Sequence, residues 1–272
     1  MIIAINPTKA IKLAPTFRAI PSPLLVPSEM ASNNVSASEP ETSTSVNLDS
    51  STSGIIILAT IRVLNGTVNN YKTTKDIIER ENYDYIIGAD GGCNHLNNMG
   101  ILPNYVIGDL DSIDEKLIKY YEDNNIIFKK FPTHKDQTDS AICVYLAKDL
   151  NATQIDFIGA LGGRIDHALA NVGFMYYIHE MGIEPRILTS EEEIFIIHND
   201  KKIIKGKKGD TISIIALRED ILGVTIEKLE YPLDRAKVSY LSPLGISNVM
   251  LEDECIITVE EGYLLVIRNL NV

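Results

Sequence analysis

Between residues 54 and 182 the sequence alternates short apolar segments with longer segments of helical periodicity, and this pattern restricts the possible folds more than any other feature. The expected strands cover residues 54–60, 83–90, 104–111, 126–132 and 154–161. The expected helices cover residues 72–81, 91–100, 116–124, 137–151 and 167–182. Such alternation is typical of an α/β fold with a largely parallel sheet. We therefore expect a three-layer, Rossmann-like α/β domain over residues 54–185.

After Pro185 the helical pattern ends, and short strand-like segments follow one another at close spacing. Closely spaced short strands are typical of an antiparallel sandwich or barrel. We expect a second, antiparallel β domain over residues 186–272.

Residues 1–53 have a different composition, dominated from Pro21 onward by Ser, Thr, Pro and Asn without apolar periodicity. Such a segment cannot bury enough apolar surface to offset the entropy of ordering it. The first 28 residues contain Lys9, Lys12 and Arg18, and the first acidic residue is Glu29. This distribution of charge weakly resembles that of an organelle transit peptide. A disordered extension or leader is the interpretation that we favour.

The chain has 272 residues and a formal net charge of −12. This acidity argues against nucleic acid or an anionic membrane surface as the main partner, because both attract clustered Lys and Arg. The apolar stretches are far shorter than the roughly 20 residues that a membrane helix needs. Cys93, Cys143 and Cys255 are widely separated and form no CxxC pair. Neither a disulfide framework nor a zinc site is indicated, and the cytoplasm is the expected compartment.

Acidic residues follow four of the expected parallel strands. In open α/β sheets the ligand lies beyond the carboxyl ends of the strands. The loops there bring six aspartates to one edge of the sheet: Asp90, Asp109, Asp111, Asp136, Asp139 and Asp166. A carboxylate cluster of this kind is the ligand set of a hard cation such as Mg²⁺, which shares its other positions with water and substrate phosphate.

Asp109 and Asp111 are two positions apart in a segment expected to be extended, so both side chains point to one side. Two carboxylates about 4 Å apart repel by roughly 4 kcal/mol at an effective dielectric constant near 20. A cation between them would remove this repulsion, which favours a metal clamp. The alternative is a turn whose aspartates cap the following helix.

Three further features of these loops suit a phosphate. Gly91 and Gly92 allow close backbone approach before a helix N-terminus, although a left-handed turn would also require glycine. Arg164 is suited to bidentate contact with a phosphate or to a structural pair with Asp166. His167 is either a proton shuttle or a residue that caps the helix, and the other histidines are interpreted as structural or surface residues.

The second domain contains one segment with polar character, residues 242–250, and one with a proline, residues 229–233. Pro232 restricts its strand to an edge or an end. Ser247 and Asn248 form a polar loop able to hydrogen-bond a ligand, and a plain hairpin turn is the alternative.

Taken together and in order, the motifs GADGG, IGDLDSI, KDQTD, GALGGRIDHALAN, EYPL and GISN resemble those of bacterial-type thiamine pyrophosphokinases. The resemblance covers residues 54–272. It implies a homodimer whose chains each have an α/β domain followed by a β-sandwich. It also implies Mg²⁺-dependent transfer of the pyrophosphoryl group of ATP to thiamine, which gives thiamine diphosphate and AMP.

The same resemblance implies roles for individual residues. The Mg²⁺-holding aspartates would be Asp109, Asp111 and Asp139. Lys135, Asp136 and Thr138 would surround substrate and phosphates, and Asp90 with Gly91 and Gly92 would lie at the phosphate or metal. Arg164 and Asp166 would lie near the nucleotide. Ser247 and Asn248 would reach thiamine from the partner subunit, and Tyr231 would stack on thiamine where some relatives have a tryptophan, which this chain lacks.

Two other functions are compatible with these residues. The first is another Mg²⁺-dependent phosphotransferase or phosphatase in which one of the paired aspartates is a covalent nucleophile. The second is a nucleotide- or thiamine-binding module without turnover.

Overall fold

The computed structural model describes residues 2–4, 58–130, 139–240 and 242–270. Lys135, Asp136 and Thr138 lie outside the described residues, as does nearly all of the segment 1–53. Within that segment, β1 (Ile2–Ala4) pairs antiparallel with β2 (Leu58–Val63). The proposed boundary of the segment at residue 53 stays a prediction.

Five helices lie where the sequence indicates them: α1 (Tyr71–Glu81), α2 (Gly92–Met99), α3 (Glu115–Asp123), α4 (Asp139–Asp149) and α5 (Ile165–Glu180). Local hydrogen bonds explain several of their ends. The Asn70 side chain accepts from the Thr73 amide at the start of α1, and Asp114 accepts from the Lys116 amide at the start of α3. Gly100, in a left-handed conformation, ends α2.

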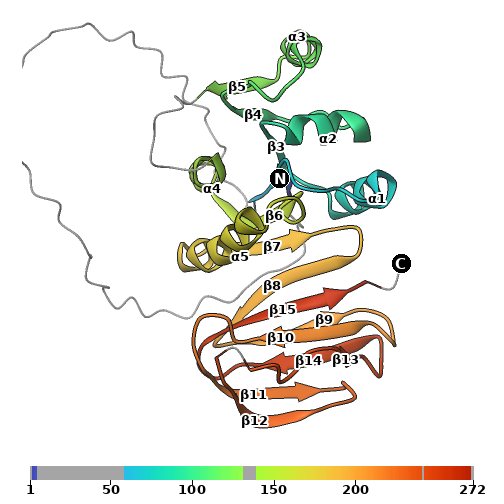
Figure 1. Ribbon diagram of the computed structural model, residues 1–272, viewed down its shortest axis with the longest axis vertical. Coiled ribbons are helices and arrows are strands. Elements are labelled where there is room, and N and C mark those ends of the chain that lie inside the picture. Colours follow the sequence, from blue (N-terminus) through green and yellow to red (C-terminus); the bar gives the residue numbers. More distant parts are fainter. Residues whose placement is uncertain (1, 5–57, 131–138, 241, 271–272) are drawn as a thin grey trace, which may run out of the picture. The chain divides into compact units, whose positions relative to one another are not determined.

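The strands that alternate with these helices are β3 (Tyr85–Ala89), β4 (Tyr105–Gly108), β5 (Ile127–Lys130), β6 (Ala152–Ile158) and β7 (Glu184–Leu188). They form a parallel sheet with β2 in the order β7-β6-β2-β3-β4-β5. Figure 1 shows α1, α2 and α3 on one side of these strands and α4 and α5 on the other. The expected three-layer α/β arrangement is confirmed. Strand order reverses between β2 and β6, the kind of position where such folds bind ligands.

The sheet does not stop at β7. Strand β8 (Glu192–His198) pairs antiparallel with β7, and β15 (Tyr263–Asn269), β10 (Thr211–Ile215) and β13 (Asn248–Val249) continue the same sheet. A second, four-stranded sheet consists of β12 (Leu233–Val238), β11 (Ile221–Glu227), β14 (Glu254–Thr258) and β9 (Lys201–Lys205). The two sheets enclose a separate apolar core, so the β-sandwich is confirmed. The predicted domain boundary at residues 185/186 falls inside β7.

Strand β8 belongs to both cores because its side chains alternate in direction. Ile194 and Ile196 pack in the α/β core, whereas Phe195 and Ile197 pack in the sandwich core. One continuous sheet thus joins the α/β part of the chain to the antiparallel β-sandwich.

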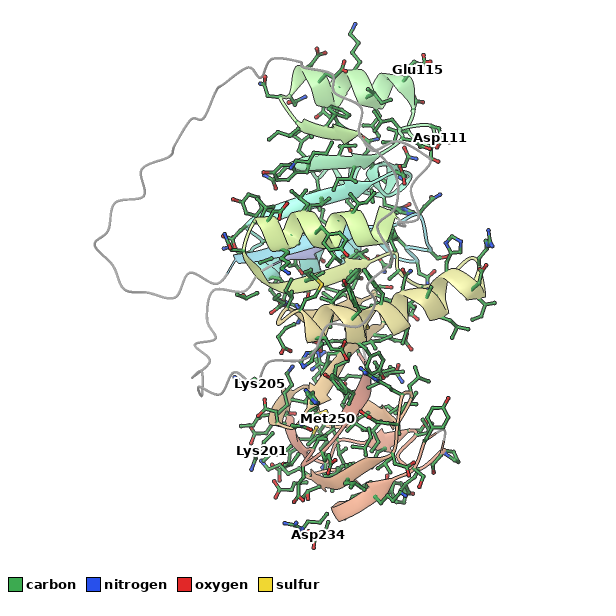
Figure 2. All side chains as sticks on the ribbon, turned by 90° about the vertical axis from the view of Figure 1, so that its left-hand side faces the viewer. Asp111, Glu115, Lys201, Lys205, Asp234 and Met250 are labelled. Atoms are coloured by element: carbon green, nitrogen blue, oxygen red, sulfur yellow. The ribbon has the colours of Figure 1, made fainter. Side chains whose placement is uncertain are left out.

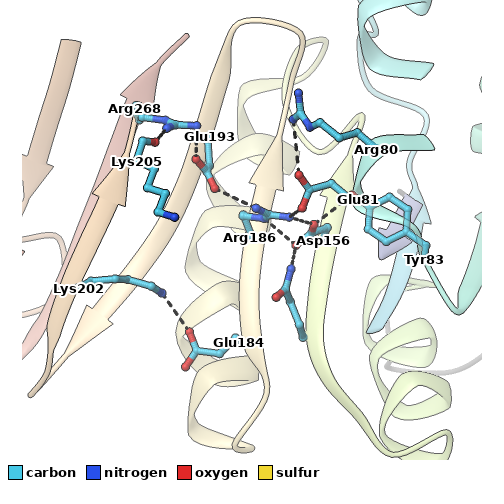
Figure 3. Close-up of polar contacts among 11 residues, drawn as sticks. Arg80, Glu81, Tyr83, Asp156, Glu184, Arg186, Glu193, Lys202, Lys205 and Arg268 are labelled. Atoms are coloured by element: carbon cyan, nitrogen blue, oxygen red, sulfur yellow. Dashed lines mark hydrogen bonds and ion pairs between the residues drawn. The ribbon is translucent and has the colours of Figure 1, made fainter. Parts of the chain in front are cut away.

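A buried ionic cluster reinforces the same junction (Figure 3). Arg186 of β7 contacts Asp156 of β6, Glu81 of α1 at 3.0 Å and Glu193 of β8 at 3.0 Å. Arg268 of β15 also binds Glu193, at 2.8 Å. Asp156 is fully buried, and burial raises its pKa although Arg186 opposes the shift.

Among the helices in the described ranges, none is long and apolar enough to cross a membrane.

Candidate active site

The loops after β3 and β4 lie side by side, as expected from the sequence. The strands pair in parallel register with Ala89 opposite Ile107, and the Asp90 amide donates to the Ile107 carbonyl at 3.0 Å. Asp90 therefore leaves the sheet beside Gly108, the residue before Asp109. A Cβ on Gly108, whose φ is 140°, would lie 1.6 Å from Asp90 Oδ1. Glycine at this position lets the Asp90 carboxylate lie directly over the start of the Asp109 loop.

Asp109 and Asp111 are both exposed on this loop. Asp109 Oδ1 accepts from the Asp111 amide at 3.2 Å, and Asp111 Oδ1 accepts from the Ser112 hydroxyl at 2.9 Å. The Asp109 side chain thus stabilises a turn, but the part of the alternative in which these aspartates cap the following helix is wrong. Asp114, not either of these residues, caps α3, so both carboxylates keep oxygen atoms directed to solvent.

The oxygen-only donor set suits a hard cation. Mg²⁺ typically takes one or two carboxylates and completes its shell with water and substrate phosphate. Within the described residues, no group of three His, Cys, Asp or Glu side chains is arranged to hold a metal ion. The third predicted ligand, Asp139, is the first residue of α4 and follows residues outside the described ranges.

Gly91 is needed for space rather than for a left-handed backbone. It precedes α2 with φ −56°, and the left-handed residue of this loop is Asp90, with φ 43°. A Cβ on Gly91 would lie 2.4 Å from Asn65 Oδ1 in the loop after β2. The glycine therefore lets the N-terminus of α2 approach that loop closely, and the left-handed-turn interpretation is wrong for Gly91. The close approach of this backbone to a phosphate stays a prediction.

His95, interpreted from the sequence as a structural or surface residue, connects α2 with the loop after β2 and with the start of α1. Its Nε2 lies 2.9 Å from the Gly66 carbonyl oxygen, and its Nδ1 lies 2.8 Å from the Tyr71 hydroxyl. Because a carbonyl only accepts, Nε2 carries the hydrogen and Nδ1 accepts from Tyr71. Burial lowers the pKa of His95, although the bond to Gly66 opposes the shift. No spacing in the sequence indicates this contact.

Arg164 and Asp166 bind each other at the start of α5. Arg164 Nε and Nη2 donate to the two carboxylate oxygens at 3.1 and 2.5 Å, and this bonding lowers the pKa of Asp166. The structural pair suggested as an alternative is thus present. Arg164 remains 74% exposed and accessible to a ligand. His167 is exposed.

A cavity of about 280 Å³ lies where the strand order reverses. It is bounded by the loops after β2, β6 and β7, and its polar lining includes Thr67, Thr189 and Ser190. Gly162, two residues before Arg164, also lines it. The loop that leads to Arg164 therefore borders a hollow that the sequence alone did not indicate.

The predicted thiamine-contacting residues lie together in the β-sandwich. Tyr231 is 64% exposed, and Ser247 is exposed and left-handed, with φ 58°. Asn248 is buried with 2% exposure and bonds the backbone of Tyr231. The family resemblance implies that these three residues meet one ligand, and in the structure Asn248, next to Ser247, contacts Tyr231.

The two groups of residues are far apart within one chain. Asn248 lies in β13 and Asp109 follows β4, and eight strand-to-strand steps separate β13 from β4 in the sheet. At about 4.8 Å per step this is about 38 Å along the sheet. Figure 2 labels Asp111 after β4 and Met250, two residues beyond Asn248, in the sandwich. One small substrate cannot touch both groups in the same chain.

Two family models match the chain, one over the α/β part and one over the β-sandwich. The family "Thiamin pyrophosphokinase, catalytic domain" matches residues 79–186, and "Thiamin pyrophosphokinase, vitamin B1 binding domain" matches residues 195–264. Thiamine pyrophosphokinase of Bacillus subtilis is 30% identical over 184 residues, which cover 67% of this chain and 86% of that protein.

Solved structures give the same result. The crystal structure of the Bacillus subtilis thiamine pyrophosphokinase superposes with a TM-score of 0.70 at 27% identity and covers 78% of this chain and 99% of that one. Yeast thiamin pyrophosphokinase has the same fold, with a TM-score of 0.66 at 20% identity and coverage of 77% and 85%. With both family domains present in order and a relative at 30% identity over most of its length, the chain belongs to the thiamine pyrophosphokinase family.

Proposed function

We propose that this chain transfers the pyrophosphoryl group of ATP to thiamine, with Mg²⁺ held by Asp109 and Asp111 together with Asp139. The observation that carries the metal proposal is the adjacency of the loops after β3 and β4, where the Asp90 carboxylate lies against Gly108, the residue before Asp109. Bound Mg²⁺ would supply charge neutralisation for the phosphates, on which this type of transfer depends.

The residues of the chain would then position two substrates. The hydroxyl-lined cavity beside Gly162 is the proposed place of the nucleoside, and Arg164 is the proposed phosphate contact at its rim. To bind phosphate with both guanidinium edges, Arg164 would exchange its bond to Asp166 for the ligand, which its exposure permits. Lys135, Asp136 and Thr138 are proposed to surround the substrate and the phosphates. Gly91 and Gly92 are proposed to lie at the phosphate or the metal.

Thiamine is proposed to bind on the sandwich surface formed by the exposed Tyr231 and Ser247, with the buried Asn248 beneath Tyr231. The exposed Tyr231 ring offers a stacking surface for the cationic thiazolium of thiamine. The hydroxyethyl group that accepts the pyrophosphoryl group must reach the aspartates, yet these lie eight strands away in the same chain. We therefore propose a homodimer in which the sandwich of one subunit supplies thiamine to the aspartates of the other.

An exposed apolar row on α5 supports association of two copies. Ile165, Leu169 and Tyr177 are 72%, 62% and 44% exposed and follow one another at multiples of four residues along one helix. Exposed apolar side chains in a row are a feature of surfaces that another protein covers. Cys93, Cys143 and Cys255 are all buried and form no disulfide in the described residues, which suits the reducing cytoplasm that we propose as the compartment.

The reaction is tested by following AMP, ADP and phosphate from ATP, with and without thiamine. The expected result is AMP that depends on thiamine, equals the thiamine diphosphate formed, disappears on chelation and returns with Mg²⁺. Release of ADP or phosphate regardless of thiamine would contradict the proposed reaction and favour a different phosphotransferase.

The shared site is tested by mixing two inactive variants, Asp111→Asn and Tyr231→Ala/Ser247→Ala. A mixed dimer has one site that combines the intact aspartates of one chain with the intact sandwich of the other. About a quarter of wild-type activity is the expected limit for random pairing, by simple combination of chains. Verified mixed dimers without recovered activity would contradict the shared site.

A further inference from the structure

The segment that carries Tyr231 is not part of a regular strand. It lies between β11 and β12 and follows Lys228, whose φ is 64°. Its first residues are held by backbone bonds to residues 249–251, because the Glu230 amide donates to the Val249 carbonyl at 2.9 Å and the Leu251 amide donates to Lys228 at 3.0 Å. Pro232 follows Tyr231 and has no amide hydrogen to continue the ladder.

At Tyr231 a side chain replaces the backbone partner. Asn248 Oδ1 accepts from the Tyr231 amide at 2.9 Å, and Asn248 Nδ2 donates to the Tyr231 carbonyl at 2.7 Å. The same Oδ1 also accepts from the Val249 amide at 3.0 Å. Both ends of the Asn248 amide are thus bound to protein, and the side chain is 2% exposed.

These contacts assign Asn248 a different task from its neighbour Ser247. Asn248 Oδ1 already accepts from two backbone amides, so a bond from thiamine to this oxygen would compete with them and leave a buried amide unsatisfied. The second Nδ2 hydrogen takes no part in these bonds, but with 2% exposure the side chain offers thiamine almost no surface. Tyr231, by contrast, presents an exposed ring from a backbone that is fixed at both its amide and its carbonyl. A ring that is already ordered loses less entropy when a ligand stacks on it.

We propose that Asn248 is a positioning residue for thiamine that acts through Tyr231, by fixing the Tyr231 backbone, and does not touch thiamine itself. The inference rests on the proposed function, in which Tyr231 stacks on thiamine.

The chain has no tryptophan, so Tyr231→Trp introduces a single fluorescent reporter at the position in question. In full-length Tyr231→Trp, thiamine should quench the emission and give a dissociation constant without turnover. Adding Asn248→Ala should lower the steady-state anisotropy of the reporter and raise the dissociation constant about tenfold, which corresponds to about 1.4 kcal/mol. Asn248→Asp keeps the acceptor oxygens but loses the bond to the Tyr231 carbonyl, and a smaller change in the same direction is expected.

The matched control is Asn199→Ala in the same reporter background. Asn199 Oδ1 also accepts a backbone bond in the β-sandwich, from the Gly262 amide at 2.9 Å. This control should lower the melting temperature without changing the anisotropy or the thiamine dissociation constant.

A double-mutant cycle on the thiamine KM completes the test. If Asn248 acts through Tyr231, Asn248→Ala adds nothing in a Tyr231→Ala background. Quenching that is unaffected by Asn248→Ala, or additive effects in the cycle, would overturn the inference and leave the thiamine site at Tyr231 intact. Absence of quenching by thiamine in an otherwise active Tyr231→Trp enzyme would instead overturn the placement of thiamine, and the inference with it.

Discussion

The carboxylate of Asp90 fills the space that a side chain on Gly108 would need, since Asp90 Oδ1 lies 1.6 Å from the position of a Cβ there. The two residues are the first beyond β3 and the last of β4, so their contact sets the distance between two loops of the candidate site. Gly108→Ala must move this carboxylate and also places a Cβ at a φ of 140°.

We expect Gly108→Ala to lower kcat by at least about tenfold and to destabilise the fold by roughly 1–3 kcal/mol, because backbone strain and a displaced carboxylate act together. Urea unfolding and the AMP assay measure the two effects. Gly182→Ala is the control, because Gly182 also has a left-handed φ, of 80°, but nothing lies within 4 Å of its added Cβ. It should cost stability without loss of kcat, and equal loss in both variants would exclude a specific effect through Asp90.

Asp111→Asn keeps the shape of the side chain and removes one ligand charge. We expect kcat to fall by roughly two orders of magnitude or more and the Mg²⁺ concentration for half-maximal rate to rise, because the variant neutralises less charge around the metal. The control is Glu115→Gln, which removes one charge four residues further on, in the first turn of α3 (Figure 2). Wild-type turnover in Asp111→Asn would contradict the metal assignment.

The alternation of strands and helices was predictable because helices and buried strands carry different apolar periods. The same alternation predicted Asp90, Asp109 and Asp111 at the ends of neighbouring strands, because parallel strands bring their carboxyl ends to one edge of the sheet. The continuity of the sheet through β8 was not predictable, because Ile194 to Ile197 form one apolar run whose alternate residues enter two different cores. Such a run gives no sign of how many cores it serves.

Site details that depend on contacts between distant residues were also beyond the sequence. The spacing of Arg164 and Asp166 left phosphate binding and pairing equally open, and only the geometry shows their bond. For Asn248, the residues alone left a ligand contact and a plain hairpin turn open, and the family resemblance implied a contact with thiamine; the structure adds that its amide is bound to the Tyr231 backbone. Long-range partners decide these roles, and local sequence contains no information on them.

Asp156 is fully buried, and among the ion pairs of the described residues its one cationic partner is Arg186. Arg186→Met should therefore destabilise the chain by about 3–5 kcal/mol, because it leaves a buried charge without compensation. Adding Asp156→Asn should recover part of this loss. The control is Arg218→Met, whose pair with Glu180 at 2.6 Å is exposed and should contribute less than about 1 kcal/mol. Urea unfolding measures all three, and similar losses in Arg186→Met and Arg218→Met would contradict a special role of burial.

Stability should fall as the pH drops below about 6.5, the ordinary pKa of histidine. Burial lowers the pKa values of His95, His179 and His198 in the folded chain. A histidine with a lowered folded pKa stays neutral there while the unfolded chain takes up its proton. Its contribution is complete above about pH 6.5 and is lost as the pH falls from that value toward the folded pKa.

His95→Gln removes one such proton uptake, so the slope of unfolding free energy against pH between 5.5 and 7.5 should become flatter. One proton changes this slope by at most about 1.4 kcal/mol per pH unit. Asn98→Ala is the control, because it removes a bond of 3.2 Å to the Tyr71 hydroxyl, which also contacts His95, without removing a titratable group, and it should keep the wild-type slope. Urea unfolding at several pH values measures it, and an unchanged slope in His95→Gln would mean that protonation of His95 does not oppose folding.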